Sequence, residues 1–142
     1  MEWYDSYNIG VEAIDRQHKE LVRRISRLQM TLSLGDVSHE VGDALRFLVD
    51  YTKRHFADEE AIMLSINFEE LPHHKELHKK FVSAVVLILI DLKKGKAIDP
   101  LAFIDFLTNW LINHIRHEDQ KIGKRLAAIG CSKEGTRGQK GQ

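Results

Sequence analysis

Histidine and carboxylate side chains recur in this sequence at the spacing of one helical turn. His55 and Glu59 are four residues apart, and so are His74 and His78. Four residues along an α-helix return a side chain to about 40° from its starting direction, so both members of each pair point the same way. Imidazole nitrogens and carboxylate oxygens are common metal ligands. Each pair therefore predicts two ligands, either for one metal ion or for two adjacent ions.

Two further segments carry the same residue types. His18 stands in an otherwise apolar stripe near the start of the chain, and His114 is followed by Glu118 and Asp119. Asp119 is five residues beyond His114, which corresponds to about 140° round an ideal helix. Glu118, four residues beyond, would share the face of His114. Spacing alone favours Glu118, and the choice between the two acidic residues stays open at this point.

Long helices are needed to bring these side chains together, and the apolar pattern supplies them. Apolar residues recur at helical spacing in four stretches, which are residues 11–34, 38–65, 72–94 and 100–130. Pro72 and Pro100 stand where two of the helices begin, and Asp99 is placed to cap the last one. Short connections predict an all-α fold, an up-down-up-down four-helix bundle.

The ends of the chain fit this pattern less well. Residues 1–10 predict an irregular arm before the first helix. Gly130 is a plausible end of the last helix, and residues 131–142 are polar and glycine-rich, so we expect them to be disordered. The expected organisation is one bundle domain over residues 1–130 followed by a tail.

Composition narrows the class of protein. The 142 residues carry 21 basic and 21 acidic side chains, so no overall charge attracts nucleic acid or a membrane surface. The most apolar run, residues 81–92, is too short to insert across a bilayer. Cys131 is the one cysteine and the start of the chain lacks a signal-peptide pattern. We expect a soluble cytoplasmic protein.

The number of ligands predicts two metal ions. Five histidines and two carboxylates are too many for one ion. If both carboxylates and a solvent-derived oxygen are shared, three histidines complete six ligands on one ion, and two leave the other with five. The open position would bind a small diatomic molecule. This ligand set suits iron among the redox metals, without excluding manganese or zinc. The histidines are His18, His55, His74, His78 and His114.

The order of the motifs resembles the hemerythrin family, in particular its single-domain bacterial branch. The motifs are Trp3…Gly10-Val11…Ile14-Asp15…Gln17-His18…Leu21, His55-Phe56-Ala57-Asp58-Glu59-Glu60…Met63, His74…His78…Phe81 and Trp110-Leu111…His114-Ile115…Asp119. The resemblance spans residues 3–119 in order and register. It selects Asp119 rather than Glu118 as the acidic ligand of the last helix.

The resemblance implies a di-iron centre with an oxo or hydroxo bridge that binds dioxygen reversibly. His74, His78 and His114 would bind one iron. His18 and His55 would bind the other iron, which takes dioxygen, and Glu59 and Asp119 would bridge the two. Five residues near these ligands are expected to line the dioxygen pocket: Leu21, Phe56, Trp110, Leu111 and Ile115. An oxygen-consuming enzyme is a conceivable partner, and single-domain relatives tend to be monomers.

Other functions fit the same ligands. A di-iron peroxidase or nitric-oxide-handling enzyme would use the same centre, a sensor would act through a separate partner, and the bundle would also accept zinc or serve without a functional metal. The near absence of further inward carboxylates counts against oxygen activation, so we expect a binding protein rather than an enzyme. The remaining histidines, His39, His73 and His117, are predicted to lie at the surface or beside the ligands.

Overall fold

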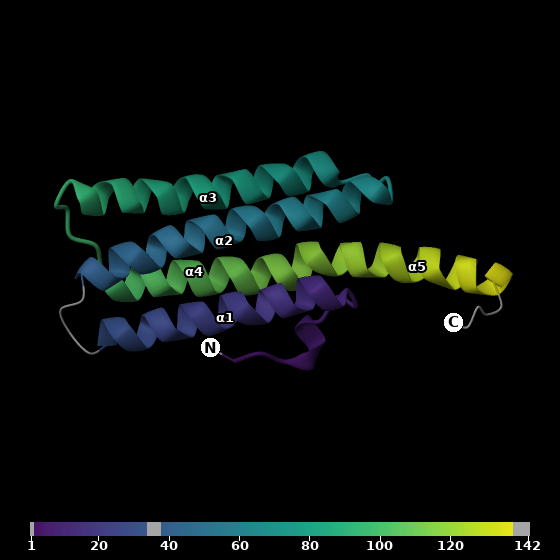
Figure 1. Cartoon of the computed structure of the whole chain (residues 1–142), viewed down its shortest axis with the longest axis horizontal. Helices are drawn as coiled ribbons and strands as arrows, with labels where there is room; N and C mark the ends of the chain where they lie inside the picture. Colours follow the sequence, from purple (N-terminus) through teal and green to yellow (C-terminus); the bar gives the residue numbers. More distant parts are fainter. Residues whose placement is uncertain (1, 34–37, 138–142) are drawn as a thin grey trace.

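A computed structural model describes residues 2–33 and 38–137, with the backbone alone for residues 38–40 and 131–137. All regular elements within these ranges are helical (Figure 1), which confirms the all-α prediction. None of the described helices is long and apolar enough to span a membrane. The long helices are α1 (Glu12–Ser33), α2 (Ser38–Ser65), α3 (Leu71–Lys93), α4 (Pro100–His114) and α5 (Gln120–Arg137).

The helices form an up-down-up-down bundle, as predicted (Figure 1). One π-helical turn, η2 (Ile115–Asp119), joins α4 to α5, so that these two helices form a single rod. The core follows the apolar stripes of the sequence: Ile14, Leu21, Ile25 and Leu28 of α1 are each at most 5% exposed. Burial of one such side chain stabilises the fold by about 1.5–3 kcal/mol.

The helix ends use the local chemistry that the sequence predicts. The carboxylate of Asp99 accepts hydrogen bonds from the backbone N–H groups of Leu101 at 3.0 Å and Ala102 at 3.4 Å, and Pro100 occupies the first helical position of α4. Gly95 follows α3 with φ of +83°, a left-handed conformation that glycine adopts without steric cost. These signals set where α3 ends and α4 begins.

The last helix is longer than predicted. It continues past Gly130 to Arg137, so the helix end expected at Gly130 is wrong, whereas the disorder expected for residues 131–142 stays a prediction. Gly130 does not have a positive φ, and nothing lies within 4 Å of the position where its Cβ would stand. A glycine with helical backbone weakens a helix by about 1 kcal/mol without ending it. Residues 138–142, which were also expected to be disordered, lie outside the described residues.

The irregular arm is tied to the start of α1. It contains one 3-10 turn, η1 (Asp5–Tyr7), and otherwise has no regular structure before α1. The Asp15 carboxylate accepts a hydrogen bond from the Ile9 N–H at 2.7 Å and another from the Gly10 N–H at 3.2 Å. Asp15 therefore fixes the chain where it turns into α1, one helical turn before His18.

The same arm is fastened to α5. The side-chain amide of Gln120 donates to the backbone carbonyls of Ser6, Tyr7 and Asn8 at 3.2–3.3 Å. A Cβ atom on Gly123 would lie 2.1 Å from the carbonyl oxygen of Ile9, so only glycine permits this close approach. The arm and the last helix are thus held together directly beside Asp119.

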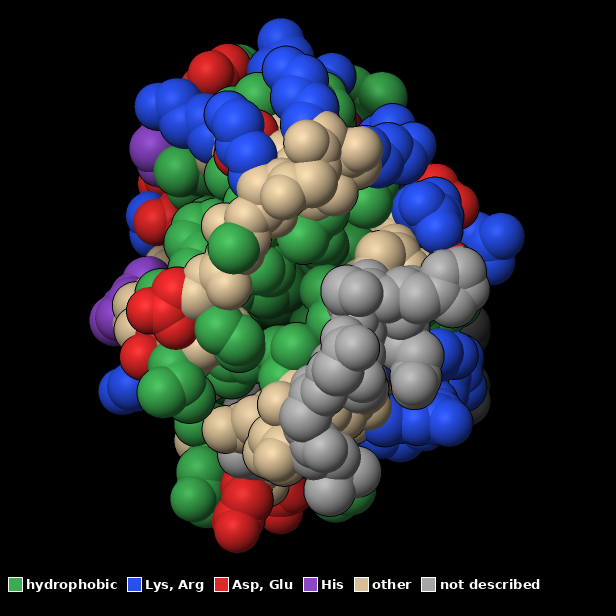
Figure 2. Space-filling view, turned by 90° about the vertical axis from the view of Figure 1, so that its left-hand side faces the viewer, with side chains coloured by type: hydrophobic (Ala, Val, Ile, Leu, Met, Phe, Trp, Pro, Cys, Tyr) green, Lys and Arg blue, Asp and Glu red, His purple; other side chains and the backbone are tan. Residues whose placement is uncertain are grey.

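One end of the bundle is apolar at its centre. Figure 2 shows this end, the left-hand side of Figure 1, with hydrophobic side chains at the centre and charged side chains of both signs around the rim. Leu101 at the start of α4 is 75% exposed. The apolar core therefore reaches the surface at the end where α4 begins, whereas the polar residues considered next lie in the interior.

Candidate metal centre

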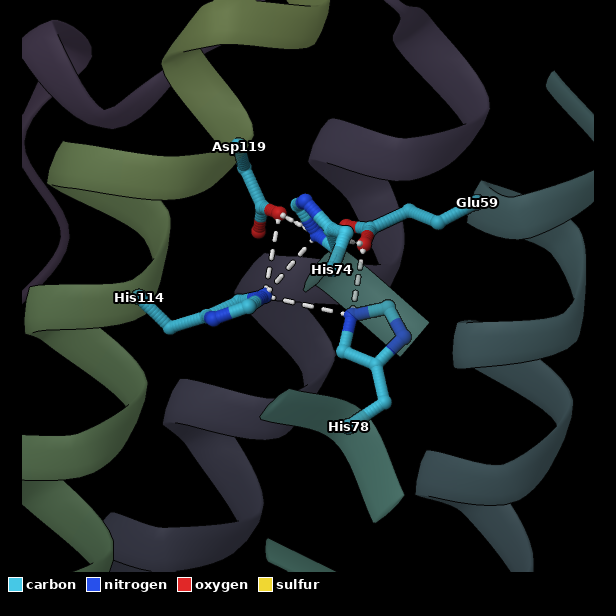
Figure 3. Close-up of side chains that lie close together, drawn as sticks. All are labelled: Glu59, His74, His78, His114 and Asp119. Carbon is cyan, nitrogen blue, oxygen red and sulfur yellow. Dashed lines mark hydrogen bonds and ion pairs between the residues drawn. The ribbon is translucent and has the colours of Figure 1, made fainter. Parts of the chain in front are cut away.

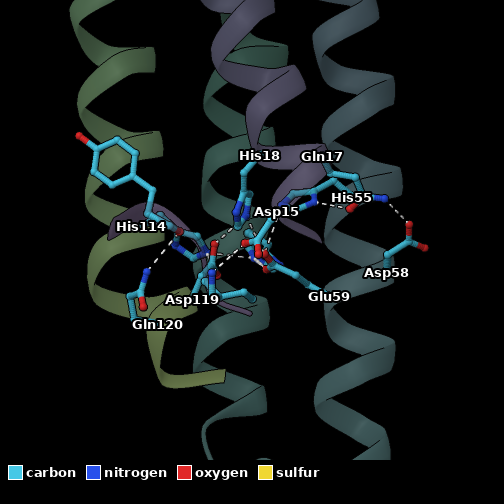
Figure 4. Close-up of polar contacts among 12 residues, drawn as sticks. Asp15, Gln17, His18, His55, Asp58, Glu59, His114, Asp119 and Gln120 are labelled. Carbon is cyan, nitrogen blue, oxygen red and sulfur yellow. Dashed lines mark hydrogen bonds and ion pairs between the residues drawn. The ribbon is translucent and has the colours of Figure 1, made fainter. Parts of the chain in front are cut away.

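Seven polar side chains converge in the interior of the bundle (Figures 3 and 4). They come from α1, α2, α3 and the single rod that α4, η2 and α5 form. Each is at most 6% exposed, although burying a polar group without a partner costs roughly 2–7 kcal/mol. Such a concentration is unfavourable for folding unless the groups bind something together. They are the residues that the sequence singled out: His18, His55, Glu59, His74, His78, His114 and Asp119.

The seven residues form two overlapping groups. Within each group, one ligand atom from every member lies within 4.8 Å of the others. The first group contains Glu59, His74, His78, His114 and Asp119, and the second contains His18, His55, Glu59 and Asp119. Only the two carboxylates belong to both groups, and the division of the histidines is the one expected from the sequence.

Glu59 of α2 divides its two oxygens between the groups. Its Oε2 atom lies 3.1 Å from Nε2 of His18 and 3.2 Å from Nε2 of His55. Its Oε1 atom lies 3.4 Å from Nε2 of His74 and 3.2 Å from Nε2 of His78. One oxygen thus faces each group, which is the arrangement of a carboxylate that bridges two cations.

Asp119 divides its oxygens in the same way. Its Oδ2 atom lies 3.0 Å from Nε2 of His18. Its Oδ1 atom lies 3.0 Å from Nε2 of His74 and 3.2 Å from Nε2 of His114. Both carboxylates therefore span the boundary between the two groups.

Three imidazole nitrogens face one another in the first group (Figure 3). Nε2 of His114 lies 3.1 Å from Nε2 of His78 and 3.1 Å from Nε2 of His74. A metal ion bound at about 2.1 Å from imidazole nitrogens separates neighbouring octahedral ligands by about 3 Å. Both distances match the spacing of neighbouring ligands on an octahedral ion.

Several buried atoms of the cluster have no hydrogen-bond partner among the described residues. They include Oε1 of Glu59 and Oδ2 of Asp119, although ring nitrogens lie only 3.0–3.4 Å away. Buried polar atoms without a hydrogen-bond partner are rare in folded proteins, and a bound ion would satisfy them. The nitrogen and oxygen donors, their spacing and these unpaired atoms all fit a pair of metal ions.

The π-helical turn explains how Asp119 joins the cluster. A π turn closes hydrogen bonds between residues five apart, so residues five apart share a face. Asp119 is fully buried, whereas the side chain of Glu118 is 22% exposed and lies 3.5 Å from Nζ of Lys121. The spacing argument for Glu118 assumed a regular α-helix, and the extra residue in the turn reverses it.

The charges within the cluster shift the pKa values of its members. Burial would lower the pKa of His18, but the negative carboxylates of Asp119 and Glu59, 3.0 and 3.1 Å from its Nε2 atom, raise it to about 9. The same balance raises the pKa of His74 to about 9. Burial would raise the pKa of Glu59, but the charge of His55 and hydrogen bonds from neighbouring imidazoles hold it well below its usual range. The site strongly favours cations beside ionised carboxylates.

The pKa of Asp119 follows the same pattern. Burial and the charge of Glu59 would raise it, whereas the charge of His114 and hydrogen bonds from His114 and His18 hold it below its usual range. Two carboxylates that stay ionised in the interior of a bundle need compensating positive charge. Protons on the histidines or metal ions can supply that charge.

Two contacts behind the cluster were missed in the sequence. Nδ1 of His55 lies 2.7 Å from Oε1 of Gln17, and Nδ1 of His78 lies 2.8 Å from Oε2 of Glu60. Each partner directly precedes or follows a cluster residue in the sequence, and this adjacency was the only available signal. Adjacent residues on a helix point about 100° apart, so which histidine they meet depends on how the helices pack.

Aromatic rings pack directly against the imidazoles. Phe56 stacks on His78 with ring centroids 3.7 Å apart, and Trp110 stacks on His114 at 4.4 Å. Trp3 of the arm lies 6.4 Å from the ring of His18. Two of the residues expected to line a dioxygen pocket, Phe56 and Trp110, thus contact histidines of the first group. The other three, Leu21, Leu111 and Ile115, are at most 5% exposed.

The remaining histidines lie apart from the cluster where the structure describes them. The side chain of His73 is 58% exposed, with its Nε2 atom 3.9 Å from a carboxylate oxygen of Glu118, and His117 is exposed. The side chain of His39 lies outside the described residues. The surface positions predicted for His73 and His117 are therefore confirmed.

Comparison with known proteins agrees with this geometry. The family model described as "Hemerythrin HHE cation binding domain" matches residues 9–126. The chain is 32% identical over 127 residues to a bacteriohemerythrin of Stenotrophomonas maltophilia, covering 89% of this chain and 81% of that protein. It is also 32% identical over 124 residues to a myohemerythrin of Riftia pachyptila, covering 87% of this chain and 92% of the other.

A solved structure is also similar. The crystal structure of a wild-type hemerythrin superposes with a TM-score of 0.83 at 28% sequence identity, covering 89% of this chain and 97% of the other. The similarity covers most of this chain and nearly all of the other, so the two proteins share the four-helix bundle fold.

Proposed function

The chain belongs to the hemerythrin family, and we propose that it binds dioxygen reversibly at two iron ions held between its helices. The observation that carries this proposal is the unequal division of the buried donors. One group has three histidines and the other has two, and Glu59 and Asp119 belong to both. An ion with fewer protein ligands keeps a position free for a small molecule.

Each of the two donor groups would hold one iron ion. His74, His78 and His114 would hold one ion, His18 and His55 would hold the other, and the two carboxylates would bridge them. A ferrous pair supplies the electrons that dioxygen needs in order to bind reversibly. Imidazole and carboxylate donors suit iron among the redox metals.

The apolar residues around the cluster exclude water from it. Leu21 and Ile115 are 1% and 0% exposed, and Leu111 is 5% exposed. A dry environment hinders the entry of water and protons that would displace bound dioxygen irreversibly. We propose that these three side chains line the dioxygen pocket, whereas Phe56 and Trp110 hold the imidazoles on which they stack.

The ligand set favours binding over catalysis. Five of the seven donors are imidazoles and only two are carboxylates. Oxidation chemistry needs highly oxidised iron, and anionic oxygens stabilise that state. A centre with only two carboxylates stabilises it less than a centre with more of them. We therefore propose storage or supply of dioxygen in a cytoplasmic setting rather than a reaction on a second substrate.

Metal analysis combined with visible spectroscopy tests this function. The purified protein should contain about two irons per chain. After anaerobic reduction, a visible absorption band should appear on aeration, disappear when oxygen is removed, and return over several cycles. The same protein loaded with zinc serves as a control and should show no such band.

Three results would overturn the proposal. One zinc per chain in the natural protein would identify a different site. Conversion to an oxidised form that does not release oxygen would exclude carriage. Multiple turnovers with peroxide or nitric oxide at a rate faster than oxygen release would identify an enzyme instead.

A further inference from the structure

The two donor groups differ in what lies behind their histidines. On the side facing away from the cluster, His55 contacts the amide of Gln17, whereas His78 contacts the carboxylate of Glu60. His55 belongs to the two-histidine group and His78 to the three-histidine group. The partner of His55 is a neutral amide, whereas the partner of His78 is an acid.

The contact to Gln17 determines which nitrogen of His55 carries the proton. The carboxylate of Asp58 can only accept, and it lies 2.8 Å from Nε2 of Gln17, which donates to it (Figure 4). The amide oxygen of Gln17 must then face His55 and accept a hydrogen bond from Nδ1–H. His55 therefore donates through Nδ1, and its Nε2 atom is the ring nitrogen that faces the cluster, 3.2 Å from Oε2 of Glu59.

The contact to Glu60 likewise determines which nitrogen of His78 donates the hydrogen bond, and here no further residue is involved. An ionised carboxylate has no proton to donate, so Nδ1 of His78 must be the donor across the 2.8 Å contact. Nε2 of His78 is then the ring nitrogen that faces the cluster, and it lies 3.1 Å from Nε2 of His114. One histidine in each group is thus oriented with its Nε2 atom towards the cluster.

We propose that Gln17 and Glu60 are positioning residues that fix His55 and His78 as Nδ1–H tautomers and that make the two ions electronically unequal. A carboxylate that accepts from an imidazole makes the ring a stronger electron donor to its metal. A neutral amide does so less. Nδ1 of His18, the other histidine of the second group, has no hydrogen-bond partner among the described residues. The ion of the three-histidine group is therefore the more electron-rich of the two.

The tautomer part of this proposal is tested in metal-free protein. Nitrogen-15 chemical shifts distinguish Nδ1–H from Nε2–H in neutral imidazole rings. Both His55 and His78 should be Nδ1–H tautomers. Gln17→Met should turn His55 into a mixture and leave His78 unchanged, and Glu60→Met should do the reverse. An Nε2–H tautomer at either ring in the parent protein, or no change in the variants, would overturn the proposal.

The electronic part rests on the proposed di-iron function and is tested by two reciprocal changes. Glu60→Gln removes the negative charge but keeps an acceptor, so the reduction potential of the iron-loaded protein should rise. Gln17→Glu adds a charge behind the other ion, so the potential should fall. Replacement by methionine removes the acceptor, and the affinity for ferrous iron should then fall by about 10–100-fold.

Glu118→Gln is the matched control. The side chain of Glu118 is 22% exposed, against 23% for Glu60, and both residues neighbour a bridging carboxylate in the sequence. Glu118 contacts His73 and Lys121 but none of the cluster histidines in the described contacts. Its replacement should leave the potential almost unchanged. Equal shifts in Glu60→Gln and Glu118→Gln would mean that charge alone acts, and would overturn the role of Glu60. Absence of iron would instead refute the proposed function while leaving the tautomer result valid.

Discussion

The Oδ1 atom of Asp119 lies 3.2 Å from Nε2 of His114, although five residues separate the two along the chain. A regular α-helix would turn Asp119 about 140° away from His114. The π turn over Ile115–Asp119 adds one residue without losing the common face. Such turns occur mostly as single turns within α-helices, frequently at functional sites.

Removal of one exposed residue from the π turn should leave the protein intact. Deletion of His117 would convert the turn to an α-helical one and place Asp119 four residues after His114, again on the same face. We expect two irons per chain and a change in unfolding free energy within about 1 kcal/mol, typical of surface changes. Metal analysis and urea unfolding measure both.

The control for this deletion is Asn109, which is equally exposed but lies within α4. Its removal would rotate His114 and Asp119 by about 100° relative to the core residues that precede Asn109 in α4. We expect loss of iron and destabilisation of more than about 4 kcal/mol. If both deletions behave alike, the π turn has no special part in placing Asp119.

Adjacent histidines on α3 should differ completely in their effect on iron. His74 is buried within hydrogen-bonding distance of Asp119, whereas the side chain of His73 is 58% exposed. His74→Ala should lower the iron content to well under two per chain and abolish the oxygen-dependent absorption band. His73→Ala should retain both. Equal retention of iron would show that His74 is not a ligand.

The stability of the metal-free protein should fall at alkaline pH. The pKa values of His18 and His74 are raised from 6.5 to about 9, so each stabilises the fold fully below about pH 6.5 and loses this effect as the pH rises through about 9. The difference corresponds to about 3 kcal/mol for one histidine. The pKa values of Glu59 and Asp119 are lowered, so their contribution is lost only in acid.

Urea unfolding between pH 6.5 and 9 tests this prediction. Chelator-treated protein should lose at least about 3 kcal/mol of unfolding free energy over this range. Iron-loaded protein should not, because a metal-bound imidazole has already released its proton. A flat profile for the metal-free protein would contradict the shifts.

A methyl group at Gly123 should separate the arm from α5. Its Cβ would lie 2.1 Å from the backbone oxygen of Ile9, so Gly123→Ala forces the arm to move. We expect destabilisation by about 1–3 kcal/mol, as for overpacked interiors, and faster proteolysis of residues 1–10. Gly130→Ala is the control, because nothing lies within 4 Å of its Cβ position. It should stabilise α5 by about 0.5–1 kcal/mol. Identical behaviour of the two variants would refute the close contact.

Much of the fold follows from the sequence because its signals are local. The apolar stripe, Pro100 and the Asp99 cap determine the helices and their ends within one or two residues, except at Gly130. The glycine signal failed there because a glycine ends a helix only when its backbone turns left-handed, as at Gly95. Sequence alone does not report that conformation.

The residues that face the interior of the candidate site were predicted better than the residues that lie behind them. The five histidines and Glu59 were identified because such residues are rare in apolar stripes, whereas Asp119 was identified from the resemblance to the hemerythrin family. The contacts of Gln17 and Glu60 were not found, since polar residues at the edge of a stripe are normally solvated. Spacing also pointed to Glu118, because a π turn leaves no mark in composition and arises from packing along the whole rod.

The two tryptophans of the chain provide a natural optical readout of the centre. Trp110 lies against His114 of the three-histidine group, and Trp3 lies near His18 of the two-histidine group. Iron beside an indole quenches its fluorescence, and each tryptophan lies beside a histidine of a different donor group. With one tryptophan replaced by phenylalanine at a time, the order in which the two positions fill can be followed in solution without any added label.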